Sequence, residues 1–106
     1  MTPDEAIQEI TRRLVERFDP RRVILFGSRA RGDAGERSDF DFMVLVDEVS
    51  DRFALVTAMY EAKRGVPVGC DFVVATEQEY ERERETPGTV FYYADREKRV
   101  LHERAA

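Results

Sequence analysis

Apolar residues recur along the chain at two different spacings. Near the start, Ile7, Ile10, Leu14 and Phe18 recur every three or four residues, which predicts a helix with one buried stripe. Short, nearly continuous apolar runs appear later, and runs of this kind predict buried strands. The expected helices span residues 3–18, 50–64, 76–85 and 89–96, and the expected strands span residues 22–26, 40–46, 66–74 and 99–102. Strands that alternate with helices predict an α/β sheet flanked by helices.

Capping signals indicate where the predicted helices begin. Thr2 with Glu5, and Thr76 with Glu79, each have the spacing of a capping box. Ser50 is expected to cap the helix that follows it, because serine is a favoured N-cap residue. In the last helix, four residues are available for packing: Val90, Phe91, Tyr93 and Ala94.

Composition narrows the class of protein. The 106 residues are 42% apolar, which predicts one globular domain over residues 1–106. The net charge of −5 argues against a broad surface that binds nucleic acid directly. The chain holds a single cysteine and no apolar run near the ~20 residues of a membrane span, and its N-terminus does not resemble a signal peptide. We therefore expect a cytoplasmic protein with no membrane segment.

The stretch from Leu25 to Val46 carries two aspartates that we expect to work together. Asp39 and Asp41 stand at i and i+2 at the start of a predicted strand, so both side chains point to one face. Two adjacent carboxylates repel each other unless a positive charge lies between them. Mg²⁺ is the simplest such partner, since it prefers oxygen ligands and is usually held by carboxylates together with substrate phosphates.

A Gly-Ser turn precedes this aspartate pair. Gly27 lets the backbone approach a ligand closely, and Ser28 is expected to be the N-cap of a helical turn over residues 28–31. Free N–H groups at a helix start attract phosphate. The stretch is therefore predicted to combine a phosphate-binding turn with a metal anchor, joined by a mobile polar loop over residues 33–38.

The spacing of these motifs resembles that of the minimal nucleotidyltransferases of the polymerase-beta-like superfamily. Their signature is Gly-Ser, about ten residues, Asp-x-Asp, and a third acidic residue on a later strand. Gly27-Ser28, Asp39, Asp41 and Asp71 match it, and the Arg-Ala-Arg-Gly run over residues 29–32 is also typical of the family. The resemblance covers nearly the whole chain and implies a small mixed sheet in which the strand of Asp71 neighbours that of Asp39 and Asp41.

The resemblance also implies an activity. Members of this family transfer a nucleoside monophosphate from an NTP to a hydroxyl group, here AMP from ATP, with two Mg²⁺ ions. By similarity, Asp39 and Asp41 hold the metals, and Asp71 completes one metal site or acts as the base. Gly27 and Ser28 hold the terminal phosphates, and Arg29 is a candidate for contact with the triphosphate.

Short members of the family are typically encoded beside a small all-helical protein of the HEPN class. The resemblance implies a small all-helical HEPN-type toxin, which the transferase neutralises by attaching AMP to a tyrosine, within a homo-oligomer or hetero-oligomer. From the length of the chain we expect no appended helical domain that binds the acceptor. Two alternatives stay open: an antitoxin that binds its partner sterically with an inherited nucleotide site, and a transferase acting on a small molecule whose pocket a second subunit completes.

The remaining candidates have plainer interpretations. His102 is expected to be an exposed edge residue, and Cys70 a buried apolar side chain. The charged run over residues 77–85 is expected to be a solvated helix face, and the aromatic run over residues 91–93 is expected to belong to the core.

Overall fold

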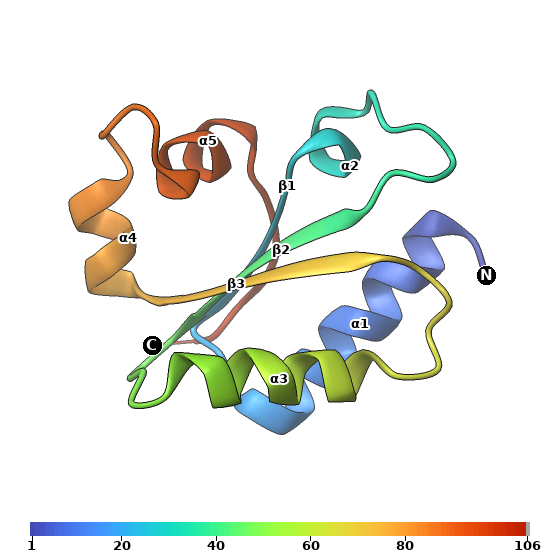
Figure 1. Cartoon of the computed structure of the whole chain (residues 1–106), viewed down its shortest axis with the longest axis horizontal. Coiled ribbons are helices and arrows are strands. Elements are labelled where there is room, and N and C mark those ends of the chain that lie inside the picture. Colours follow the sequence, from blue (N-terminus) through green and yellow to red (C-terminus); the bar gives the residue numbers. More distant parts are fainter. Residues whose placement is uncertain (106) are drawn as a thin grey trace.

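The computed structural model describes residues 1–105 and contains a four-stranded sheet with helices on both faces (Figure 1). In chain order the elements are α1 (Pro3–Phe18), β1 (Arg22–Phe26), α2 (Ser28–Arg31), β2 (Phe40–Val46), α3 (Arg52–Lys63), β3 (Cys70–Thr76), α4 (Glu77–Glu83), α5 (Val90–Glu97) and β4 (Arg99–Glu103). The predicted small mixed sheet flanked by helices is confirmed.

The sheet has the strand order β3-β2-β1-β4. Strand β1 is antiparallel to both β2 and β4, whereas β2 and β3 are parallel. A parallel pair needs a crossover connection, and α3 provides it between β2 and β3. This pairing brings the start of β2 beside the start of β3, and the predicted site lies at this end of the two strands.

The two central strands are buried on both faces, which explains their continuous apolar runs. Within β2, Phe42 and Val44 face the core shared with α1 and α3, whereas Met43 and Leu45 face the core shared with α4 and α5. Figure 1 shows α1 and α3 on one side of the sheet and α4 and α5 on the other. Burial from both sides stabilises the fold by about 25 cal/mol per Å² of apolar area removed from water. It also fixes the register of β2, because a slip of one residue would turn every side chain to the other face.

Several predicted boundaries were wrong. Strand β3 begins at Cys70 rather than at residue 66, because its first partner in β2 is Phe40, which pairs with Cys70. Residues before that point form a turn, in which the Val68 N–H donates to the carbonyl of Val66 at 2.9 Å. Helix α3 is capped by Asp51 rather than Ser50, since the Asp51 carboxylate accepts a hydrogen bond from the Ala54 N–H at 3.0 Å. Both predicted capping boxes are confirmed.

The packing of α5 also differs from the prediction. Val90 and Tyr93 are exposed, at 37% and 52% of their surface, whereas Ala94 is buried and Phe91 packs on Tyr80. The helix is short and turns only a narrow stripe toward the sheet, so the buried aromatic ring on this face comes from α4 instead. His102 is partly buried rather than exposed, because it lies in β4 opposite Val23.

Tyr80 is buried, and its hydroxyl donates to the Asp95 carboxylate at 2.5 Å. Burial opposes ionisation of Asp95, but hydrogen bonds from Lys98 and Tyr80 outweigh it and lower the pKa of Asp95 to about 2. A carboxylate with a lowered pKa stabilises the fold above its unfolded pKa of about 4, and this contribution is lost as the pH falls toward 2.

Tyr80→Phe is therefore expected to lower the free energy of unfolding by about 1 kcal/mol at pH 7, the net contribution of one hydrogen bond. Urea denaturation measures it. Tyr60→Phe is the matched control, because Tyr60 is 41% exposed and its ring packs edge-on against Phe72. Equal loss in the two variants would show that the Tyr80–Asp95 bond adds no stability.

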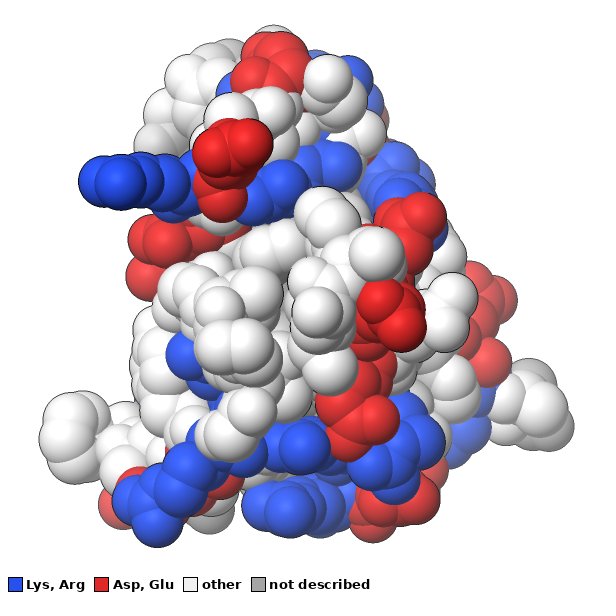
Figure 2. All heavy atoms as spheres, turned by 90° about the vertical axis from the view of Figure 1, so that its right-hand side faces the viewer, with Lys and Arg blue, Asp and Glu red and all other residues white. Residues whose placement is uncertain are grey.

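Charged side chains of both signs lie close together on the surface. Figure 2 shows basic and acidic groups interspersed on the face that carries the N-terminus, rather than one continuous basic surface. On α1, for example, Arg12 pairs with Glu9 and Glu16. Among residues 1–105, no helix has both the length and the apolar character needed to cross a membrane.

Candidate active site

Three aspartates lie near one another where strands β2 and β3 begin. Asp41 in β2 and Asp71 in β3 are direct partners in the parallel register, and adjacent strands lie about 4.8 Å apart. Asp39 comes immediately before β2, two residues from Asp41 and therefore on the same face. Phe40 and Phe42 are buried on the opposite face, as expected. The fold thus brings Asp71 to the aspartate pair, which the resemblance implied and spacing alone could not show.

Burial and the neighbouring carboxylates disturb the ionisation of Asp41. Burial raises the pKa of Asp41, and the neighbouring charges of Asp71 and Asp39 raise it further. The charge of Glu97 acts in the same direction. The cluster is therefore arranged to accept a cation or a proton.

The Gly27 turn lies directly against Asp41. Gly27 has φ 73° and ψ −160°, a backbone region that essentially only glycine adopts. A methyl group added there would overlap the Asp41 carboxylate. The absence of a side chain thus lets the Gly27 backbone lie close to the Asp41 carboxylate.

The predicted helical turn over residues 28–31 is confirmed as α2, but its N-cap lies one residue earlier than predicted. Gly27 is the N-cap of α2, and Ser28 is its first helical residue, so the prediction of Ser28 as N-cap was wrong. The Gly27 carbonyl accepts hydrogen bonds from Ala30 and Arg31, both at 3.0 Å, and no side chain caps this turn. The Ser28 hydroxyl is therefore not needed to cap the helix.

A second glycine makes room for Asp39, and the sequence analysis assigned it no role. A methyl group at Gly69 would overlap the Asp39 carboxylate. The Gly69 carbonyl accepts a hydrogen bond from the Phe40 N–H at 2.9 Å, which joins the segment before β3 to the start of β2. Its position two residues before Asp71, on the same face, is the only sequence signal that could have indicated this function.

Glu97 is a further residue that sequence reasoning missed. It is the last residue of α5, and its carboxylate accepts a hydrogen bond from the Gly27 N–H at 3.1 Å and from Arg31 Nη1 at 2.6 Å. Its charge also contributes to the raised pKa of Asp41. Glu97 is 70 residues from Gly27 along the chain, so no local motif could reveal this contact.

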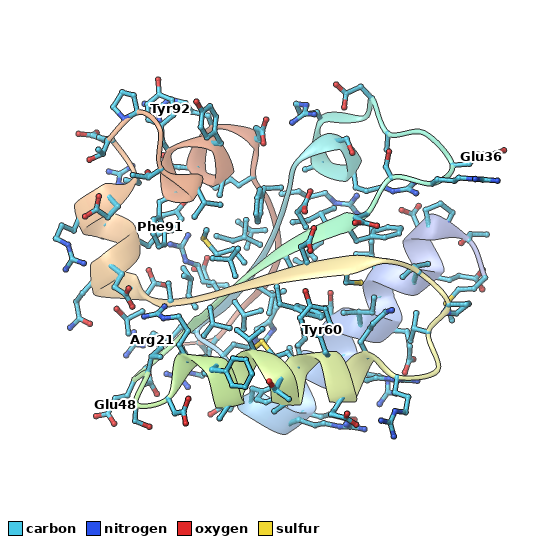
Figure 3. The ribbon with its side chains drawn as sticks, in the orientation of Figure 1. Arg21, Glu36, Glu48, Tyr60, Phe91 and Tyr92 are labelled. Atoms are coloured by element: carbon cyan, nitrogen blue, oxygen red, sulfur yellow. The ribbon has the colours of Figure 1, made fainter. Side chains whose placement is uncertain are left out.

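Arg29 holds the loop that joins α2 to β2. Its guanidinium donates to the backbone carbonyls of Ser38 at 3.0 Å and Glu36 at 3.3 Å, and it lies 4.4 Å from the centre of the Phe40 ring. Figure 3 shows Glu36 on this loop, at the outer edge of the molecule. Contact between Arg29 and a triphosphate stays a prediction, and the bonds that the structure shows position the loop leading into Asp39.

The donor set suits a hard cation. Among residues 1–105, no three His, Cys, Asp or Glu side chains are grouped closely enough to hold a metal ion by themselves. The Asp41–Asp71 pair supplies carboxylate oxygens beside the Gly27 turn, and Mg²⁺ typically takes one or two carboxylates and completes its shell with phosphate and water. The residues present therefore fit a Mg²⁺ ion that arrives with a nucleotide.

Comparisons with known proteins agree with this geometry. The family model described as "Nucleotidyltransferase domain" matches residues 7–104. The fold is similar to that of a candidate nucleotidyltransferase from Sulfolobus solfataricus, with a TM-score of 0.67 and 24% identity over 94% of this chain and 79% of that one. It is also similar to a chain of a toxin–antitoxin structure with AMP-PNP, with a TM-score of 0.63 and 20% identity over 92% of this chain and 73% of that one.

No curated protein sequence matches this chain. At these identities the two solved structures establish the fold alone, whereas the family model spans nearly all of the sequence. The chain belongs to the nucleotidyltransferase domain family.

Proposed function

We propose that this chain transfers a nucleoside monophosphate, AMP from ATP, to a hydroxyl group of an acceptor. The observation that carries the proposal is the register pairing of Asp41 with Asp71 directly beside the Gly27 turn. A metal-bound triphosphate needs carboxylates that hold the metal and a backbone segment that the phosphates can approach closely. Membership of the nucleotidyltransferase domain family supports the same reaction class.

In the proposed reaction, Asp39 and Asp41 would hold two Mg²⁺ ions together with the triphosphate, and Asp71 would complete the site on the acceptor side. Bound Mg²⁺ would activate the attacking hydroxyl and stabilise the leaving pyrophosphate. The acceptor oxygen attacks the α-phosphorus as the bond to the bridging oxygen breaks, and Asp71 accepts the hydroxyl proton. Gly27 and Ser28 hold the terminal phosphates, and Arg29 keeps the entry loop in place.

The acceptor we propose is a tyrosine of a HEPN-type helical protein, with this chain acting as its antitoxin in the cytoplasm. Support comes from the toxin–antitoxin structure with AMP-PNP, one chain of which shares this fold. Asp71 is exposed, so this side of the site is open to a second surface. Correct orientation of two reactants can account for about 7–11 kcal/mol of a barrier, and an open site leaves that contribution to the partner.

The test is a transfer assay with the helical partner. The chain alone, with α-labelled ATP and Mg²⁺, is expected to show little turnover, whereas addition of the partner places label on a partner tyrosine. Mass spectrometry of the mixture shows a gain of one or more AMP units, and EDTA abolishes it.

The alternatives predict different results in the same assay. A tight complex without modification under any NTP would favour a steric antitoxin. Labelling of a small-molecule acceptor, but not of the protein, would favour a small-molecule transferase completed by a second subunit.

A further inference from the structure

One carboxylate already occupies the donors of the Gly27 turn. Glu97 takes the Gly27 N–H with one oxygen at 3.1 Å and Arg31 Nη1 with the other at 2.6 Å. The Glu97 side chain is only 20% exposed, so its bond with the Gly27 N–H is partly shielded from water, whereas the Arg31 side chain is 44% exposed. Arg31 also pairs with Asp33 at 3.2 Å, but that contact is more exposed.

Glu97 resembles a phosphate in both charge and hydrogen bonding. Backbone N–H groups and arginine guanidinium groups bind phosphate oxygens in many proteins. The hydrogen bond that each donor makes is stronger when the acceptor is an anion than when it is neutral. A triphosphate placed against Gly27 would need the same N–H and would bring further negative charge beside Glu97. The carboxylate and the phosphate cannot share that donor.

We propose that Glu97 is an internal competitor for the triphosphate, which holds the Gly27 turn and Arg31 in the nucleotide-free state and must leave when nucleotide binds. The proposal rests on the function proposed above and concerns regulation of that same site. Glu97 ends α5 and lies two residues before the start of β4. A change of its side-chain rotamer would release the turn without moving either element. Release also removes one of the negative charges near Asp41, which favours arrival of a metal-bound nucleotide.

Two other functions of Glu97 give opposite predictions. If the residue only positions Gly27 and Arg31 for phosphate, its removal weakens binding. If it is a metal ligand, its removal weakens binding only when Mg²⁺ is present. Unlike these two functions, a competitor predicts that removal strengthens binding of an anion without any metal.

The experiment is calorimetric titration of the whole chain with two probes, AMP-PNP with Mg²⁺ and inorganic pyrophosphate in EDTA. Glu97→Gln and Glu97→Ala are compared with the wild type, and Glu85→Gln, an exposed residue before α5, is the matched control. If Glu97 occupies the turn about 90% of the time, the variants should bind both probes roughly tenfold more tightly than the wild type. Thermal melts confirm that each variant is folded, and the amide resonance of Gly27 should shift when pyrophosphate binds.

Each outcome decides the matter. Tighter binding of both probes by the Glu97 variants, with Glu85→Gln unchanged, supports the competitor. Wild-type binding of AMP-PNP together with equal or weaker binding of either probe by the variants overturns the competitor and leaves the proposed function intact. Absence of AMP-PNP binding in the wild type and in every variant overturns both.

Discussion

Asp41→Asn is expected to reduce nucleotidyl transfer by about 100-fold or more. Metal ions supply several kcal/mol of transition-state stabilisation, and each 1.36 kcal/mol is a factor of ten in rate. Asparagine keeps the shape of the side chain but loses the charge that we propose holds the metal beside Gly27. The assay is the same transfer of label from α-labelled ATP to the partner.

The same change is expected to stabilise the nucleotide-free fold. Burial and the charges of Asp71 and Asp39 raise the pKa of Asp41. A carboxyl with a raised pKa binds more protons in the folded than in the unfolded state, so wild-type stability falls as the pH rises through that pKa. Asp41→Asn removes this loss, so in EDTA at pH 7 the variant should melt at a higher temperature than the wild type.

Mg²⁺ and a matched control complete the test. Mg²⁺ should raise the melting temperature of the wild type more than that of Asp41→Asn, because ligands stabilise the state that binds them. Asp47→Asn, after the far end of β2, should have the opposite effect on stability, since hydrogen bonds from Arg21 and Arg104 lower the pKa of Asp47. It should leave transfer unchanged. Full activity of Asp41→Asn would remove the metal-site proposal.

Most features whose partners are close in sequence were predicted, although the N-caps of α2 and α3 were each misplaced by one residue. The apolar run of β2 and the capping boxes at Thr2 and Thr76 depend on neighbours within a few positions, and their predicted places are confirmed. The limits of β3 depend on its pairing with β2, which the order of residues within β3 does not encode, so its start was placed four residues too early.

The candidate site divides in the same way. Gly27, Asp39 and Asp41 lie within one short stretch whose spacing is itself the signal. Glu97 and Gly69 reach the site from other elements through tertiary contacts, and neither has a recognisable local pattern. Asp71 is intermediate, because an aspartate in an otherwise apolar strand is conspicuous, but only the parallel register shows that it faces Asp41.

Three glycines allow effects on the stability of the fold to be separated from effects on nucleotidyl transfer. Gly27 combines a positive φ with a close approach to Asp41, Gly65 has a positive φ of 91° with open space around it, and Gly69 approaches Asp39 without a positive φ. Substitution by alanine therefore tests three situations: both effects, strain alone and overlap alone. A residue held in a sparsely populated backbone region destabilises a protein by about 1–3 kcal/mol.

Gly65→Ala is expected to lower the free energy of unfolding by about 1 kcal/mol, because a left-handed backbone disfavours a Cβ, and to leave transfer unchanged. Gly69→Ala should lower stability little, since the Asp39 carboxylate can rotate away, but that rotation moves a proposed metal ligand and should reduce transfer. Gly27→Ala should show both losses and should also weaken AMP-PNP binding, because the new methyl group displaces Asp41 and strains the turn. Urea denaturation and the transfer assay on all three variants provide the comparison. If Gly27→Ala lost only the stability that Gly65→Ala loses and kept full transfer, the close approach of the turn to Asp41 would have no part in the reaction.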